Sequence, residues 1–267
     1  MKRIFFLWLG ISLVCSVQAQ EYKRIVSLAT SITQNLYLLE ANQYMVGCTQ
    51  FCVTRPEDSL VVVADAVHAY VEKIVALQPD IVLASGLTEP KVLETLERMG
   101  IKTKRLMPPR SFEEICQQFV ELGKLAGKQD RAQSIVDQSK ESLQALKKEV
   151  LGKPVLRVFM EIGCNPLFTV LPNSFMQDYI QLAGGINIAQ ELDKEVVSKE
   201  FVFLQDPDVI FVVGMGIVGE EELANWKKMK NLKATRNNKI FSLDSYICSP
   251  TPITFVETVK KIIELMY

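Results

Sequence analysis

The stretch from Lys128 to Val150 limits most strongly what this chain can fold into. Its apolar residues recur at steps of three and four, and neither glycine nor proline interrupts it, a pattern typical of one long amphipathic helix. Gly127 precedes the stretch, and Gly152 with Pro154 stops it. At about 1.5 Å per residue, such a helix would be roughly 34 Å long. Strand and helix patterns lie on both sides, so we expect the helix to join two lobes that could hold a ligand between them.

Residues 1–19 have the pattern of a secretory signal peptide. Two basic residues precede the apolar run Ile4 to Val14, which is too short to cross a membrane. Small residues at the −3 and −1 positions predict cleavage after Ala19. A rival interpretation, lipid attachment at Cys15, would place the large Val14 where a small residue is wanted. We therefore expect a periplasmic protein released by cleavage.

The rest of the chain predicts an α/β fold. The segments 81–84 and 209–213 are apolar at every position, as expected for strands of a parallel sheet with both faces covered. Strands alternate with helices throughout, which also favours parallel sheets. We predict two lobes with mainly parallel sheets, bridged by a single long helix, with the ligand cleft between the lobes. The expected division is an N-terminal α/β lobe at 20–126, the linking helix at 127–151 and a C-terminal α/β lobe at 152–267.

Individual elements follow from hydrophobic periodicity and from turn residues. The expected strands are residues 24–30, 44–48, 81–84, 101–106, 155–161, 209–213 and 239–243. The expected helices besides the long one are residues 31–40, 71–77, 91–99, 112–126, 174–183, 201–205, 221–230 and 252–266. Thr30 or Ser31 is the expected N-cap of the first of these helices, and Ser111 that of the fourth.

The two halves of the chain resemble each other. The sequence Leu77 to Asp80 recurs as Leu204 to Asp208, in each case directly before an apolar strand. A glutamate lies eight residues before the last aspartate of each copy, Glu72 in the first half and Glu200 in the second. Matches in the same order predict two lobes that arose by duplication.

Composition argues against several classes of function. A formal net charge of −1 with no run of like charges argues against nucleic-acid binding. His68 is the only histidine, so a His-rich metal site is not expected. A secreted hydrolase is a distant alternative function, and it would need His68 as its catalytic base. The five cysteines beyond residue 19 are scattered and odd in number, which does not predict a disulfide framework. Whether Cys48 and Cys52 pair stays open, with separate thiols favoured.

The candidate site consists of loops at the carboxyl ends of the expected strands, where α/β sheets bind ligands. The glycines at 214, 216 and 219 follow a strand, but the acidic residue that a dinucleotide site requires is missing. The loops carry aromatic, hydroxyl and glycine residues, which suit stacking and hydrogen bonding to a large ligand. We therefore expect a binding protein that is not an enzyme and has no resident cofactor or metal. The candidate ligand-binding residues are Thr30, Ser31, Phe51, Ser85, Gly86, Asn165, Phe168, Met215, Gly216, Asp244, Ser245, Tyr246 and Ile247.

Four segments carry a resemblance to a known family: Arg24 to Leu28, Ile74 to Ala84, the long helix, and Gly184 to Asn187. They resemble periplasmic substrate-binding proteins of ABC importers for cobalamin, haem and iron-siderophores. Within that group, the segment from Arg157 to Thr169 looks closest to the cobalamin-binding members. The resemblance covers essentially the whole chain after residue 19. It implies a monomer with little hinge motion that delivers cobalamin or a related corrinoid to a permease and its ATPase.

The resemblance also implies roles for particular residues. One surface glutamate in each lobe of these proteins docks onto arginines of the permease, and the matching positions are Glu72 and Glu200, the pair that the internal repeat contains. Cobalamin contacts in the family match Phe51 and the loop from Asp244 to Ile247.

One feature departs from the family and leaves the ligand open. The cobalamin-binding members line their cleft with several tryptophans, whereas Trp226, expected on an outer helix, is the only tryptophan here beyond residue 19. A ferric siderophore and haem therefore remain alternatives. Tyr70 and Tyr246 could serve as ligands of haem iron.

Overall fold

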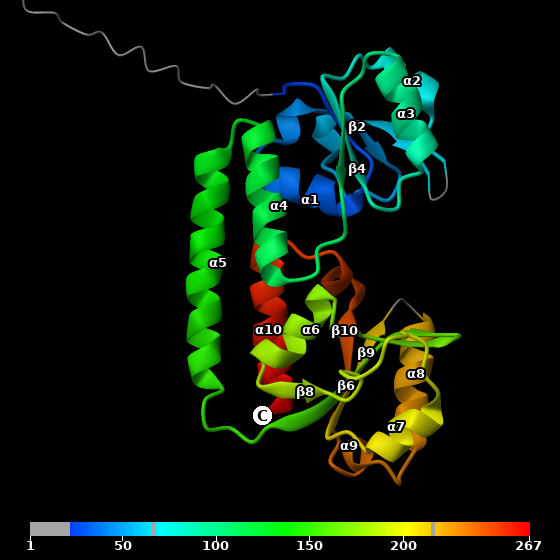
Figure 1. Ribbon diagram of the computed structural model, residues 1–267, viewed down its shortest axis with the longest axis vertical. Coiled ribbons are helices and arrows are strands. Elements are labelled where there is room, and N and C mark those ends of the chain that lie inside the picture. Colours follow the sequence, from blue (N-terminus) through cyan, green and yellow to red (C-terminus); the bar gives the residue numbers. More distant parts are fainter. Residues whose placement is uncertain (1–21, 66–67, 215–216) are drawn as a thin grey trace, which may run out of the picture.

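The computed structural model describes residues 22–65, 68–214 and 217–267. Two α/β lobes lie one above the other along the long axis of the molecule, and each has its own sheet (Figure 1). The predicted fold class, two lobes with mainly parallel sheets bridged by one long helix, is confirmed. Within the described ranges, no helix combines the length and the apolar character needed to cross a membrane.

The N-terminal lobe has a five-stranded parallel sheet in the order β3-β2-β1-β4-β5. The strands are β1 (Ile25–Ser27), β2 (Met45–Thr49), β3 (Val61–Ala64), β4 (Ile81–Ser85) and β5 (Thr103–Leu106). The helices are α1 (Thr30–Leu38), α2 (Val71–Ala76), α3 (Pro90–Arg98) and α4 (Phe112–Leu125), with 3-10 turns at Asn42–Tyr44 and Pro56–Asp58. The loops that follow β1, β2 and β4 share a cavity with Ser249 of the second lobe, so the carboxyl edge of this sheet faces that lobe.

The C-terminal lobe has the sheet order β10-β9-β6-β7, with β8 also paired to β6. The strands are β6 (Leu156–Cys164), β7 (Leu167–Thr169), β8 (Gly185–Asn187), β9 (Val209–Gly214) and β10 (Ile240–Asp244). The helices are α6 (Phe175–Leu182), α7 (Lys199–Gln205), α8 (Ile217–Lys228), α9 (Lys233–Arg236) and α10 (Pro252–Met266), with a 3-10 turn at Ser245–Cys248. Only the β6–β7 pair is antiparallel among the strand pairs described.

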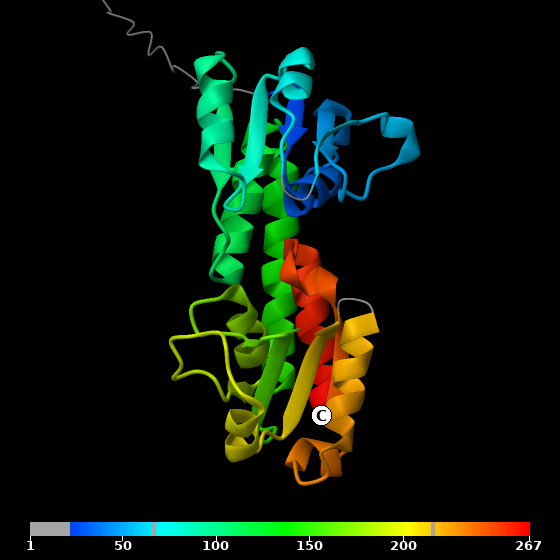
Figure 2. The ribbon, with the colours of Figure 1, turned by 90° about the vertical axis from the view of Figure 1, so that its right-hand side faces the viewer.

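The long helix α5 (Gln129–Glu149) ends within one residue of the predicted helical stretch, Lys128 to Val150, on each side. Its buried stripe is Ala132, Val136, Ser139, Leu143 and Leu146. The helix contacts α4 along the N-terminal lobe and α10 along the C-terminal lobe (Figures 1 and 2). The packed stripe therefore holds both lobes against one rod.

A joint of aromatic residues connects the lobes beside α5. Phe255 of α10 lies between Phe112 at the start of α4 and Tyr179 of α6, with ring centroids 4.6 Å and 4.4 Å away. The backbone N–H of Phe112 donates to the carboxylate of Asp178, also in α6, at 2.8 Å. Residues from both sheets and from α4, α5 and α10 form one continuous hydrophobic core through this joint.

The repeated sequence produces the same contacts in both lobes. Asp80 accepts hydrogen bonds from the backbone N–H of Arg24 at 2.9 Å, and Asp208 accepts one from that of Arg157 at 2.8 Å. The Arg24 guanidinium donates to the carbonyl of Leu77 at 2.6 Å, beyond the end of α2. The Arg157 guanidinium donates to the carbonyl of Gln205 at 3.1 Å, at the end of α7. In each lobe an arginine thus binds the carboxyl end of the equivalent short helix, α2 or α7. The helix dipole favours a positive charge at that end.

One expectation from the sequence is wrong, one strand was missed, and the burial of one side chain was not predicted. No side chain caps α1: Ala29, with an extended backbone, occupies the N-cap, and Thr30 already belongs to the helix. The strand β3 was not predicted, although its run of valines is typical of a strand. Trp226 lies on the outer helix α8, as expected, and its side chain is fully buried against Phe159 of β6.

Candidate ligand-binding cleft

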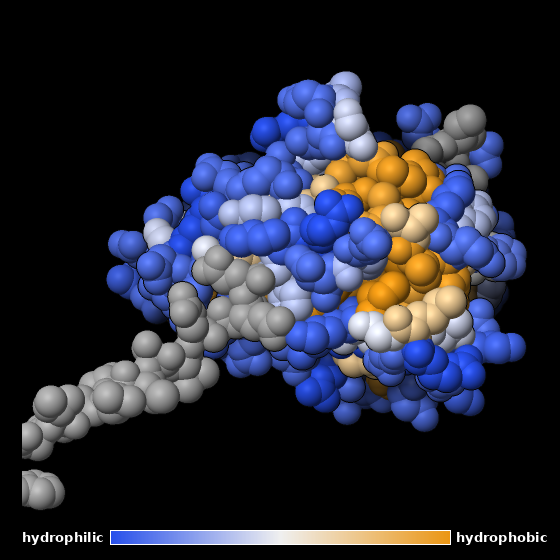
Figure 3. Space-filling view, turned by 90° about the horizontal axis from the view of Figure 1, so that it is seen from above, coloured by the Kyte–Doolittle hydropathy of each residue, from blue (hydrophilic) through white to orange (hydrophobic). Residues whose placement is uncertain are grey.

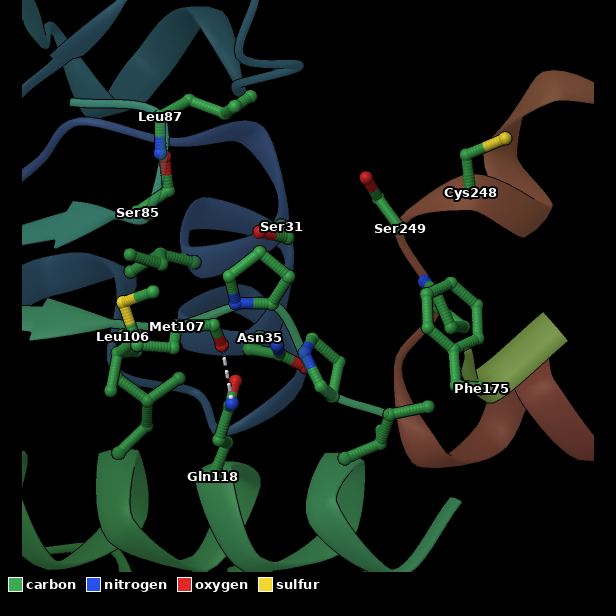
Figure 4. A pocket seen from close by; sticks show the side chains of 17 residues that line it. Ser31, Asn35, Ser85, Leu87, Leu106, Met107, Gln118, Phe175, Cys248 and Ser249 are labelled. Atoms are coloured by element: carbon green, nitrogen blue, oxygen red, sulfur yellow. Dashed lines mark hydrogen bonds between the residues drawn. The ribbon is translucent and has the colours of Figure 1, made fainter. Parts of the chain in front are cut away.

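Two adjacent cavities lie where the lobes face each other. The smaller has a volume of about 210 Å³ and is bounded by α1, α4 and the loops after β4 and β5 from one lobe (Figure 4). Phe175 and the segment 248–250 close it from the other lobe. The larger cavity, about 380 Å³, lies over the carboxyl ends of β1, β2 and β4. Ser31, Ser85 and Ser249 line both cavities, so together they form one cleft.

The smaller cavity is neutral. None of the residues that line it carries a charge; polar groups come from Ser31, Asn35, Ser85, Gln118 and Ser249. The side-chain amide of Gln118 donates to the carbonyl of Met107 at 2.7 Å (Figure 4). Asn35 Oδ1 is buried and has no hydrogen-bond partner in the part of the chain that the structure describes. An unmet buried carbonyl costs about 1–3 kcal/mol, so this wall is suited to a ligand that donates an N–H.

The larger cavity contains most of the site residues predicted in the first lobe. Thr30, Ser31, Phe51 and Ser85 line it, and the Phe51 side chain is 56% exposed. Gly86 lines the smaller cavity, where a Cβ at its position would lie 2.7 Å from Cδ of Pro108. Glycine is therefore the residue that lets the loop after β4 pass this close to the proline.

Of the candidate residues of the second lobe, those that the structure describes line neither cavity. Asn165 lies in the turn between β6 and β7, and Phe168 is part of β7 and packs over Gly163. Asp244 ends β10 and pairs with Lys261 at 3.1 Å. Ser245 and Tyr246 are exposed in the following 3-10 turn, whereas the Ile247 side chain is buried and its carbonyl accepts a hydrogen bond from Tyr179. Met215 and Gly216 lie outside the described residues.

Sequence reasoning missed the cavity residues that come from helices or from the loop after β5. They include Asn35, Met107, Pro108, Gln118 and Phe175, together with Ser249, two residues past the predicted loop. One signal was available. Asn35 lies four residues after Ser31 on the same helix, and residues at that spacing share a helix face.

Glu161, outside the cleft, is a buried carboxyl group in the core of the second lobe. Its side chain is 2% exposed and accepts a hydrogen bond from the indole N–H of Trp226. Burial raises the pKa of Glu161 from its usual 4.5 to about 7, and the nearby Glu222 carboxylate adds to this rise. The Trp226 hydrogen bond and the Lys199 ammonium oppose it.

This carboxyl group predicts a pH dependence of stability. Below pH 4.5 Glu161 is protonated in both states, whereas between pH 4.5 and 7 only the folded state keeps the proton, so stability falls as pH rises and the loss is complete above pH 7. The loss is on the order of 3 kcal/mol at 1.36 kcal/mol per unit. Because Glu161→Gln carries no titrating proton, urea unfolding at pH 5 and pH 8 should show the wild type losing about 2–3 kcal/mol relative to this variant. Glu264→Gln, at an exposed position, is the matched control and should lose as much stability between pH 5 and pH 8 as the wild type. If Glu161→Gln differs from the wild type by no more than Glu264→Gln does, the prediction is contradicted.

Three comparisons with known proteins bear on this cleft. The sequence model of the family described as "Periplasmic binding protein" matches residues 25–247. The Vitamin B12-binding protein of Vibrio parahaemolyticus is 27% identical over 237 residues, covering 87% of this chain and 85% of that protein. The ABC transporter substrate-binding lipoprotein YvrC of Bacillus subtilis is 24% identical over 93% of this chain and 81% of its own length. The periplasmic haem-binding protein HutB of Vibrio cholerae has a similar structure, with a TM-score of 0.81 and 18% identity over 91% of this chain and 98% of that one, a likeness of fold alone.

Proposed function

The chain belongs to the family of periplasmic binding proteins, the substrate-binding proteins of ABC transporters, and from that premise we propose that it captures cobalamin or a related corrinoid and delivers it to the permease of an importer. Residues 1–19 direct its export and are then removed, in this proposal. The vitamin B12-binding relative supports the choice of ligand, although 27% identity leaves the ligand to be decided by the cleft.

The observation that carries the proposal is the neutral lining of the smaller cavity. A corrinoid presents a broad, mostly apolar ring face edged with amides, which donate N–H groups. Asn35 Oδ1 offers an unmet acceptor, and Ser31 and Ser85 offer hydroxyl groups beside it. A ferric siderophore that keeps a negative charge, or the carboxylates of haem, would instead favour Arg or Lys, which this lining lacks.

The tyrosines argue against haem as the ligand. Tyr70 donates its phenolic O–H to Asp65 at 2.8 Å, and this hydrogen bond raises the pKa of Tyr70. Iron would be bound by the phenolate, which a neighbouring carboxylate disfavours. Tyr246 is exposed and lines neither cavity of the cleft.

We assign permease docking to Glu72 and Glu200. Both are exposed and lie in the first turn of the equivalent short helices α2 and α7, which occupy opposite ends of the molecule (Figure 1). Helix dipoles alone would favour glutamates there.

An apolar patch on the end surface of the first lobe supports an interface as well (Figure 3). On the β3 strand that α2 contacts, Val61 and Val62 are exposed. An apolar centre with charged groups around it is typical of protein interfaces.

Calorimetric titration of the purified protein with cyanocobalamin, ferric hydroxamate, ferric catecholate and haem tests the ligand. We expect cyanocobalamin to bind with a submicromolar Kd, roughly −8 kcal/mol or better. Phe51→Ala should weaken this binding by about 1–3 kcal/mol, because the exposed ring is lost as a stacking surface. Val53→Ala, an exposed residue of the same loop, is the matched control and should bind normally. Tight binding of a siderophore or of haem without a cobalamin signal would refute the ligand and leave the transporter assignment intact.

A further inference from the structure

Two cysteines lie beneath the wall of the larger cavity, at the end of β2. Cys48 is a buried residue of the strand, and Cys52 follows one turn later at the edge of the surface. The turn is closed by a hydrogen bond from the backbone N–H of Cys52 to the carbonyl of Thr49, at 3.1 Å. The two cysteines thus lie in one turn, four residues apart, and their thiols are near enough to shift each other's pKa. Both residues are free thiols in the structure.

The surroundings of the two sulfurs give them different reactivity. The Cys48 thiol and the hydroxyl group of Thr49, whose oxygen lies 3.2 Å from Cys52 Sγ, lower the pKa of Cys52 to about 6. The same contact between the thiols, together with burial, raises the pKa of Cys48. The accessible cysteine is thus the one that is ionised at neutral pH, and the thiolate is the form that reacts.

We propose that Cys48 and Cys52 form a reversible disulfide that locks the turn carrying Phe51. With a small-molecule disulfide as oxidant, the Cys52 thiolate attacks one sulfur of the reagent and releases one thiolate. That thiolate takes the proton of Cys48, whose sulfur then attacks Cys52 Sγ and expels the second thiolate. The Cys52 thiolate and the Cys48 thiol become one disulfide, and the reagent becomes one thiol and one thiolate, which takes a proton from the solvent.

The position of the pair gives this bond a consequence for the cleft. Thr49 and Phe51, which lie between the cysteines, both line the larger cavity. The Thr33 hydroxyl oxygen lies 3.1 Å from Cys52 Sγ, and its proton is donated to Ser27 at 2.8 Å. Ser27 in turn donates to the carbonyl of Ala29, at the start of α1. A sulfur–sulfur bond of about 2.0 Å would replace the hydroxyl contacts of Cys52 and fix the Phe51 turn to the strand. The inference does not depend on which ligand the cleft holds.

The sequence allows a direct test. Between Arg24 and Lys73 the only site for trypsin, Arg55, precedes Pro56, so one tryptic peptide contains both cysteines and no other. The protein is equilibrated with oxidised and reduced glutathione at neutral pH, alkylated and digested. We expect this peptide to lose both alkylation sites on oxidation and to regain them on reduction. Cys116→Ser should behave like the wild type, whereas Cys48→Ser should stop at a glutathione adduct on Cys52.

Hydrogen exchange tests the effect on the turn without any ligand. Amides between Thr49 and Thr54 should exchange several-fold more slowly in the oxidised wild type than in the reduced protein, and Cys48→Ser should show no such change. A wild-type peptide that stays alkylated, that keeps glutathione, or that pairs with another cysteine overturns the proposal. A disulfide that forms without slowing exchange in this turn overturns the locking.

Discussion

Changing Glu72 and Glu200 together to arginine is expected to abolish uptake of cyanocobalamin while leaving its affinity for the purified protein nearly unchanged. The two glutamates lie in the first turns of α2 and α7, at opposite ends of the molecule, and neither lines the cleft. If each meets a basic surface of the permease, the double reversal places like charges together at both contacts. Uptake of labelled cyanocobalamin in a strain lacking the native gene, complemented with the variant, measures the effect.

The control for this prediction is a second double reversal, of Glu149 and Glu264 to arginine. Both are exposed glutamates on other helices, and the net charge changes by the same amount. This variant should transport normally. Normal transport by the Glu72→Arg/Glu200→Arg protein would show that docking uses another surface, without bearing on the ligand.

The second large effect is expected at the joint between the lobes. Phe255→Ala should lower the free energy of unfolding by about 3–5 kcal/mol, because a fully buried ring is removed from between Phe112 and Tyr179 and a cavity is left. The lobes should also lose their fixed relative position, since this ring contacts both α4 and α6. Urea unfolding measures the first effect and solution X-ray scattering the second.

Phe159→Ala is the control that distinguishes the loss of the joint from the loss of any buried aromatic ring. Phe159 is equally buried but packs against Trp226 inside the second lobe. It should cost a similar free energy and leave the scattering profile unchanged. A loss below about 1 kcal/mol for Phe255→Ala, or the same change of scattering in both variants, would contradict the role of the joint.

Periodicity was sufficient to predict the long helix and the parallel sheets, because each depends on a local pattern of burial. It could not predict the joint, since the pattern that buries Phe255 does not say that Phe112 and Tyr179 are its partners. Only part of the cleft was predicted, because local patterns do not show which helix faces meet across it. The search was confined to loops at strand ends, which includes Phe51 and Ser85, whereas Asn35 and Gln118 face the cleft from helices. The burial of Trp226 depends on which face of α8 meets the sheet, and the prediction addressed only the position of the helix.

The continuous core has a consequence for how a membrane partner could recognise a loaded molecule. The core runs from one sheet to the other along α4, α5 and α10, so we expect free and bound forms to differ by a few degrees of twist. In both lobes, an arginine holds the carboxyl end of the short helix whose first turn carries the proposed docking residue, Glu72 or Glu200. If Glu72 and Glu200 are the two contact points with the permease, we expect the distance between them to stay the same whether the cleft is empty or full. A permease that contacts both glutamates could then not distinguish the loaded from the empty protein by the distance between them. It would have to detect the bound ligand at the open side of the cleft.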